Sequence, residues 1–245
     1  MQNFFNYFDH RYQQKLKMGK ATECGPIITI SRQTGCDAVA LAKKLVHNLN
    51  RKYNTNKWHW IDKEILLAAA RELGTGTHRV ERYIKGKELS GFSEMIMAIS
   101  GDFVSDLKVK KTISDVVLSM CKEGYVILVG IGGVAITANV MKALHVRLVA
   151  PFYWRVENVM KKRSMDIETA EEFVVDTDEK RYNLIINFLE KKPLNLDYLF
   201  DITFKRNSFS IDQIARMLTH IYEERIHAAT DQAAEKNEGL QSTYG

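Results

Sequence analysis

The sequence predicts an α/β protein with a mainly parallel sheet covered by helices on both faces. Short apolar runs rich in Val and Ile alternate with longer segments whose apolar residues recur every three or four positions. The short runs are typical of strands buried on both faces, and the longer segments of amphipathic helices. Strands that alternate with helices in this way pair in parallel, because each helix returns the chain to the same edge of the sheet.

The first half of the pattern gives two strands and two helices. A β-branched run at residues 26–31 predicts a strand, and a polar turn separates it from a helix at 38–50, whose lysines and asparagines lie on one face. A second strand is expected at 58–61. The helix predicted at 63–73 ends at the Gly-Thr-Gly-Thr run that follows it.

The second half continues the alternation. Helical spacing covers residues 92–120, with a break near Ser100-Gly101, and the densely charged stretch 152–190 also reads as helix with a polar break. Three further strands are expected at residues 125–129, 144–150 and 198–204. A closing helix is predicted at 211–225.

Length and composition favour one α/β domain with two extensions. The 245-residue chain is 45% hydrophobic, and no change of composition marks a linker within the predicted domain. We therefore expect a basic, helical N-terminal extension over residues 1–25, the domain over 26–225, and a polar, disordered tail over 226–245. The aromatic residues of the extension suit a helix docked on the domain or on a second subunit, giving a homo-oligomer, or an interfacial helix.

Cysteine usage and hydropathy indicate a cytoplasmic protein. The three cysteines, Cys24, Cys36 and Cys121, are odd in number and far apart, which argues against disulfides and zinc sites. No apolar run approaches the roughly 20 residues that a membrane helix requires, and the first residues contain no signal-peptide core. The seven histidines show no ligand spacing, so no metal site is predicted.

The basic charge is concentrated near the N-terminus, where residues 1–60 hold ten Lys or Arg against three Asp or Glu. This field suits a nucleotide or a small phosphorylated ligand. A nucleic-acid surface needs the same sign of charge, but the basic residues do not interleave with an RNA-binding or DNA-binding motif.

The polar turn after the first strand is the first candidate site. Ligands of open α/β sheets bind beyond the carboxyl ends of the strands. The turn leads into a helix, whose free N–H groups and positive dipole end suit a phosphate. A second glycine-rich turn, Gly130-Ile-Gly-Gly-Val-Ala135, matches a dinucleotide-binding pattern, but the next strand offers no acidic residue for a ribose.

Short motifs in fixed order link these segments to a known family. In chain order they are Ile28-Thr-Ile-Ser-Arg-Gln-x-Gly35, Ala42-Lys-Lys-Leu45, Ile61-Asp-Lys-Glu-Ile65, Val129-Gly-x-Gly132, Ala143-Leu-His-Val146, Ala150-Pro151 and Arg155-Val-Glu157. Taken together over about residues 26–222, they resemble the cytidylate kinase-like family. The resemblance implies a five-stranded P-loop NTPase or nucleoside monophosphate kinase fold with a helical lid, here at about residues 155–190.

The resemblance also implies an activity and its residues. The activity is ATP-dependent phosphorylation of a nucleoside monophosphate, with CMP as the expected acceptor and with ATP and Mg²⁺. The nucleotide-binding residues would be Arg32, Gln33, Thr34, Gly35, Cys36 and Asp37. Those bordering the acceptor would be Asp62, Lys63, Gly130 and Gly132. The catalytic residues of the lid would be Arg155, Arg163, Asp178 and Arg181; a solvated pair of charged helices is the other interpretation of this stretch.

Departures from the family pattern support an alternative function. A P-loop ends in Gly-Lys-Ser/Thr, and the aligned residues here are Asp37, Ala38 and Val39. The family usually has glycine at Asp37, arginine at Val39 and another arginine at Ile131. Asp37 stands where a helix N-cap belongs, so its carboxylate could take the N–H groups that a phosphate would otherwise use. The alternative is thus a catalytically inactive pseudokinase scaffold for binding or regulation, with Asp37 in the donor-phosphate site.

One residue of the turn admits two interpretations. Cys36 lies near a helix N-terminus, which can lower a thiol pKa and make the side chain reactive. It can equally be a small residue that fits a tight turn.

Overall fold

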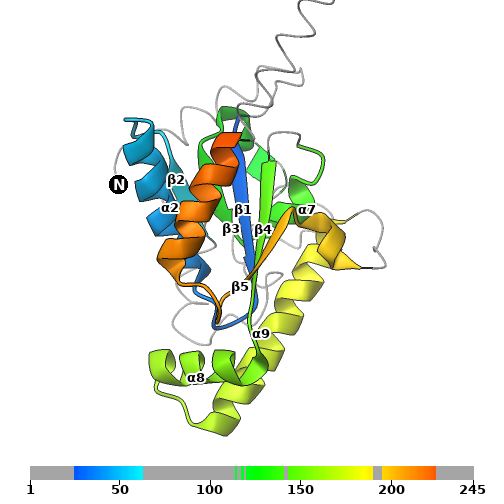
Figure 1. Cartoon of the computed structure of the whole chain (residues 1–245). Coiled ribbons are helices and arrows are strands. Elements are labelled where there is room, and N and C mark those ends of the chain that lie inside the picture. Colours follow the sequence, from blue (N-terminus) through cyan, green and yellow to red (C-terminus); the bar gives the residue numbers. More distant parts are fainter. Residues whose placement is uncertain are drawn as a thin grey trace, which may run out of the picture.

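The fold is a single parallel sheet flanked by helices (Figure 1). The computed structural model describes residues 25–62, 114, 117–118, 120–140, 143–189 and 195–224. The strands are β1 (Ile27–Arg32), β2 (His59–Ile61), β3 (Val126–Val129), β4 (Ala143–Val149) and β5 (Ile202–Lys205). Their spatial order is β2-β3-β1-β4-β5, and all neighbouring pairs are parallel. The prediction of a five-stranded parallel sheet is therefore confirmed.

The centre of the sheet forms because its strands are almost wholly apolar. β1 lies between β3 and β4, with Ile27 paired to Val126 on one side and to Ala143 on the other. All four residues of β3 are buried, as expected for a strand covered on both faces. The carboxyl ends of these strands therefore meet at one edge, where the loops after β1 and β3 lie next to each other.

Two helices cover one face of the sheet. They are α2 (Ala38–Lys52) and the helix over residues 211–224, which lie side by side in Figure 1. Leu41 and Leu45 of α2 pack with Ile214 and Leu218 against alternate residues of the central strands. Lys44 and Asp212 form an ion pair between the two helices at 2.7 Å.

The opposite face contacts α7 (Gly133–Ile136). Gly133 packs there against Leu128 and Thr29. The hydroxyl of Thr29 and Nδ1 of His145 are hydrogen-bonded at 2.9 Å between neighbouring strands. Helices on both faces agree with the sequence prediction.

A helical pair follows β4. It consists of α8 (Phe152–Arg163) and α9 (Ile167–Phe188), and it lies beyond the carboxyl ends of β1 and β4 in Figure 1. Ser164 ends α8 with a left-handed backbone (φ 54°), and the Asp166 carboxylate caps α9 by accepting from Thr169 N at 2.8 Å. The two helices share a small apolar core of their own, formed by Val156, Val159, Ala170 and Val174. The predicted helices and their polar break are confirmed.

Some predicted elements differ or cannot be compared. The strand expected at 198–204 is wrong at its beginning, because Leu196–Leu199 forms a 3-10 helix after Asn195, whose side chain accepts from Asp197 N at 2.8 Å. The predicted helix at 63–73, most of the one at 92–120, and the two terminal extensions lie outside the described residues. Within the described part of the chain, no helix is long and apolar enough to cross a membrane.

Candidate functional site

The loop after β1 is in direct contact with the start of α8. Gly35 has a left-handed backbone (φ +90°), and a Cβ built on it would lie 2.7 Å from the backbone oxygen of Arg155. The Asn158 side chain donates to the Gly35 carbonyl at 3.3 Å. Only glycine combines this backbone conformation with this close approach. We call residues 33–37 the donor loop from here on.

Asp178 of α9 reaches the donor loop. Its Oδ1 accepts hydrogen bonds from the backbone N–H of Thr34 at 2.6 Å and from the Thr34 hydroxyl at 2.7 Å. The same hydroxyl accepts from Arg181 Nη1 at 2.9 Å. Asp178 and Arg181 of the predicted lid therefore both contact Thr34 of the predicted nucleotide-binding loop. Thr34 and Arg181 are 147 positions apart in the sequence.

Arg155 connects the carboxylate to the base of the helical pair. Its Nη1 donates to Asp178 Oδ2 at 2.6 Å, and its Nε donates to the Ala150 carbonyl at 3.0 Å. The side chain is buried, with 7% of its surface exposed. A buried guanidinium with a carboxylate and a carbonyl as partners has a fixed orientation.

Arg32, the last residue of β1, joins the donor loop to the loop after β3. Gly130 in that second loop has φ +74°, and a Cβ built on it would overlap Arg32 Nη1. Burial, followed by the charge of Arg181, lowers the pKa of Arg32 to about 9, while Asp62 and Asp178 oppose the shift. Arg32 therefore remains a cation at neutral pH, between the two loops.

The structure describes three of the four residues expected to border the acceptor: Asp62, Gly130 and Gly132. Asp62 follows β2 and is buried, close enough to Arg32 to influence its pKa. Gly132 begins α7 with φ +66° and packs against the ring of Phe188 at the end of α9. Lys63 lies outside the described residues.

Asp37 is the N-cap residue of α2, as predicted, but the predicted capping by its carboxylate is wrong. Its backbone is left-handed (φ 57°), unlike the extended conformation of an ordinary capping residue, and its side chain makes no capping hydrogen bond. The carboxylate forms an ion pair with Lys162 of α8 instead. The carboxylate that accepts from a donor-loop N–H belongs to Asp178, which the resemblance placed in the lid and not at this N–H group.

The remaining donor-loop side chains have structural roles. Cys36 is fully buried, and burial raises the pKa of its thiol to about 11, so the interpretation as a reactive thiolate is wrong. Gln33 Oε1 accepts from Ala150 N at 3.0 Å, which attaches the loop to the end of β4.

Among the residues that the structure describes, cations outnumber carboxylates around the donor loop. The cations are Arg32, Arg155, Lys162, Arg163, Arg181 and Arg206, and the carboxylates are Asp37, Asp62 and Asp178. Six positive charges against three negative charges leave an excess of three. Such a field favours a polyanionic ligand.

Three of the residues around the loop were missed from the sequence: Asn158, Lys162 and Arg206. Arg206 follows β5 at the same edge of the sheet, stacks on Trp154 at 5.6 Å and donates to the Phe209 carbonyl. The sequence could have indicated Arg206 as a site residue, because it directly follows a strand. Asn158 and Lys162 lie on the face of α8 that meets the loop, and nothing in their sequence context distinguishes them from solvated residues.

The described residues do not suit a resident metal ion. They contain no group of three or more His, Cys, Asp or Glu side chains arranged to hold one. Two carboxylates of the site already pair with cations, Asp37 with Lys162 and Asp178 with Arg155. The position that supplies a hydroxyl to Mg²⁺ in a P-loop is Val39.

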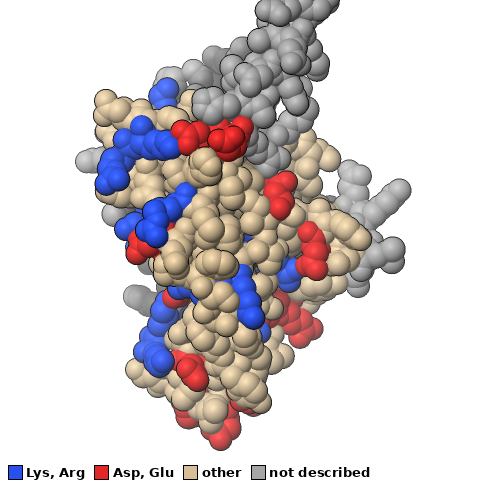
Figure 2. Space-filling view, viewed as in Figure 1, with Lys and Arg blue, Asp and Glu red and all other residues tan. Residues whose placement is uncertain are grey.

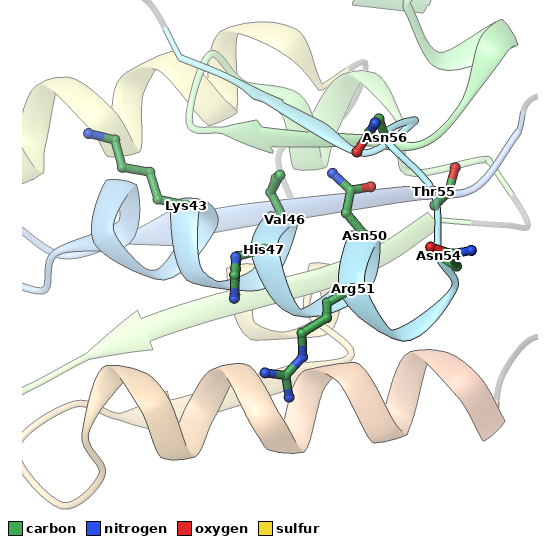
Figure 3. Close-up of a pocket in the computed structure, with 8 residues that line it drawn as sticks. All are labelled: Lys43, Val46, His47, Asn50, Arg51, Asn54, Thr55 and Asn56. Carbon is green, nitrogen blue, oxygen red and sulfur yellow. The ribbon is translucent and has the colours of Figure 1, made fainter.

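A separate pocket of about 600 Å³ lies on the outer side of α2 (Figure 3). Its polar groups come from α2 and from the turn that follows, including Lys43, His47 and Arg51. Both polar side-chain atoms of Asn50 are hydrogen-bonded to the backbone of Trp58 at 3.0 Å, and Lys43 lies over the Trp60 ring.

Basic side chains along α2 and α8 are visible on the face of the molecule that Figure 2 shows.

Comparisons with known proteins agree with this architecture. The model of the cytidylate kinase-like family matches residues 27–208. The chain belongs to the cytidylate kinase-like family. The match includes the donor loop, both glycines of the loop after β3, and the helical pair. A comparison with curated proteins gives no match.

Solved structures resemble the chain at low identity. An uncharacterized protein from Eubacterium ventriosum is 18% identical with a TM-score of 0.53, over 81% of this chain and 98% of that one. Shikimate kinase from Acinetobacter baumannii in complex with shikimate is 13% identical with a TM-score of 0.46, over 82% and 95%. A gluconokinase from Sinorhizobium meliloti is 8% identical with a TM-score of 0.44, over 86% and 98%. The likeness to the first of these concerns the fold alone.

Proposed function

We propose that the protein binds ATP through the donor loop and transfers a phosphoryl group to a nucleoside monophosphate, with CMP as the expected acceptor. The observation that carries the proposal is the convergence of Arg155 and Arg181 on Thr34. Phosphoryl transfer depends mainly on positioning and on neutralising charge at the transferred group. Guanidinium groups from a helical pair, next to the donor loop, supply both.

Each cation has a distinct place in this proposal. Arg32 lies between the donor loop and the loop after β3, where a phosphoryl group would pass from donor to acceptor, so it would take the charge-neutralising part of the missing lysine. Arg181 lies over the donor loop on the side of α9. Arg155 is held by Ala150 and Asp178 and would fix the position of Thr34. Arg163 lies against Phe173 at 4.3 Å and adds positive charge near Arg181.

The acceptor would occupy the side of Arg32 that Asp62 and the loop after β3 border. Mg²⁺, if used, would arrive with the phosphates of ATP and neutralise part of their charge. The buried, free thiol of Cys36 suits a reducing compartment, so the cytoplasm is part of the proposal.

A second function is supported by one set of residues. Ala38 and Val39 cannot replace the lysine and the hydroxyl of a P-loop, and Asp37 places a negative charge beside the loop. A protein with these residues could bind a nucleotide or a partner without turnover, as a pseudokinase scaffold. The Asp178 carboxylate, which accepts hydrogen bonds from Thr34 of the donor loop, also favours this function.

An assay of ADP release with ATP and each nucleoside monophosphate separates the two functions. We expect turnover with CMP, and a loss of about 10²- to 10³-fold in kcat on Arg181→Ala, typical of removing one charge-stabilising donor. Arg216→Ala, an exposed arginine of the helix over 211–224, is the matched control and should retain activity. A nucleotide-dependent rise in Tm without turnover for any acceptor would instead support the scaffold.

A further inference from the structure

We propose that the Asp178 carboxylate is an internal anion that closes the phosphate site of the ligand-free protein, and that a phosphate group enters by displacing it. The inference rests on the proposed function only in taking a phosphate as the ligand. It assigns to Asp178 a regulatory part, because the affinity of the site for phosphate then depends on how often Asp178 leaves the loop.

The partners of Asp178 are those of a bound anion. One oxygen accepts from the Thr34 N–H and from its hydroxyl, at 2.6 and 2.7 Å, and the other accepts from Arg155 at 2.6 Å. Arg181 Nη1 lies 3.9 Å from the carboxylate, in position to contribute as well. A backbone N–H, a hydroxyl and two guanidinium groups are the usual donors to a phosphate in proteins. The site is therefore complete, and a side chain of the same molecule occupies it.

Asp178 can leave this site without unfolding the domain. It lies on α9, whose apolar core is shared with α8, while Phe188 at the end of α9 packs against Gly132. Its side chain is 25% exposed, so water already reaches the carboxylate. Displacement requires only that α9 move relative to the donor loop, or that the side chain rotate into solvent. A ligand can then bind only to those molecules in which Asp178 has left the loop. The apparent affinity for the ligand is therefore lowered in proportion to the fraction of such molecules.

Asp37 does not compete in this way. Its carboxylate pairs with Lys162 and makes no capping bond to the amides of α2. The two acidic residues near the loop therefore have different expected effects, although both add negative charge. This difference makes the inference specific to one residue.

Titration calorimetry of the full chain with sodium pyrophosphate tests the inference. Asp178→Asn removes the charge but retains the shape, and it should bind pyrophosphate roughly 10- to 100-fold more tightly than wild type, the range expected from losing charge-assisted hydrogen bonds. Asp176→Asn is the matched control, since Asp176 is exposed on the same helix and pairs with Lys180. It should bind within twofold of wild type.

Several results would overturn the inference. They are equal or weaker binding by Asp178→Asn, a larger gain from Asp37→Asn than from Asp178→Asn, or no pyrophosphate binding by either protein. A failure of the kinase proposal is distinguishable, because tighter binding by Asp178→Asn without phosphorylation of any nucleoside monophosphate would contradict the kinase and retain the internal anion.

Amide hydrogen exchange provides a second test, and its measurement on wild type does not depend on the folding of a variant. The Thr34 N–H donates to Asp178 in the structure, so we expect slow exchange before any ligand is added. In Asp178→Asn the exchange should be at least about tenfold faster, and pyrophosphate should slow it again. Fast exchange of this amide in ligand-free wild type would contradict the proposal directly.

Discussion

Replacing Gly35 by alanine tests the packing that places the donor loop against α8. The added Cβ would lie 2.7 Å from the backbone oxygen of Arg155 and 3.0 Å from its Cα. These are main-chain atoms of a helix, so they cannot rotate away. The left-handed backbone at Gly35 costs an L-residue about 1–2 kcal/mol, and overpacking costs about 1–3 kcal/mol. We expect the free energy of unfolding to fall by about 2–5 kcal/mol.

Urea denaturation at equilibrium measures this loss, which should appear as a lower midpoint with an unchanged slope. Gly130→Ala is the matched control, because its backbone is also left-handed but the obstructing atom is the end of the Arg32 side chain. It should cost only about 1–2 kcal/mol in stability while weakening pyrophosphate binding. A loss below about 0.5 kcal/mol for Gly35→Ala, within the range of surface substitutions, or equal losses for the two variants, would refute the reasoning.

Three further predictions concern buried groups of the site. Because burial lowers the pKa of Arg32 to about 9, the fold disfavours the charged guanidinium, most fully below pH 9 and less as the pH rises above 9. Arg32→Met should therefore keep or raise Tm at pH 7 and weaken pyrophosphate binding, and a lower Tm would contradict this. Cys36, with its thiol pKa near 11, should resist iodoacetamide at pH 8 in the native state and react in urea, as read by peptide mass mapping; rapid native labelling would contradict its burial. Arg155→Lys should lower the free energy of unfolding, measured by urea denaturation, by about 1–3 kcal/mol, because one ammonium group cannot reproduce the hydrogen bonds to Ala150, Thr34 and Asp178. An unchanged free energy of unfolding would contradict the bridging role of Arg155.

The strands and helices of the described domain were predictable because their periodicities differ. A run such as Val126–Val129 has no polar face, whereas α2 has a regular one, and each pattern admits one kind of element. The prediction at 198–204 was wrong because the side chain of Asn195 starts a 3-10 turn, a local hydrogen bond that hydropathy does not reveal. Positions of strands thus follow from pattern, while their ends depend on individual side chains.

The site was predictable as a set of residues but not as a set of contacts. The resemblance assigned Thr34 to the nucleotide-binding loop and Arg155, Asp178 and Arg181 to the lid, and in the structure hydrogen bonds join all four. Which carboxylate reaches the loop could not be inferred, because it depends on the left-handed backbone at Asp37 and on the reach of a helix 144 residues away. Neither quantity is encoded in the local sequence.

The central claim is that the donor loop and the helical pair hold the phosphates of ATP. Calorimetric titration of ATP with Mg²⁺ into the full chain tests this most directly. The account predicts saturable binding to one site with a Kd below about 1 mM, within the range typical of enzyme substrates, and at least tenfold weaker binding by Arg181→Ala. Absence of saturable heat in wild type, or equal binding by Arg181→Ala, would contradict it.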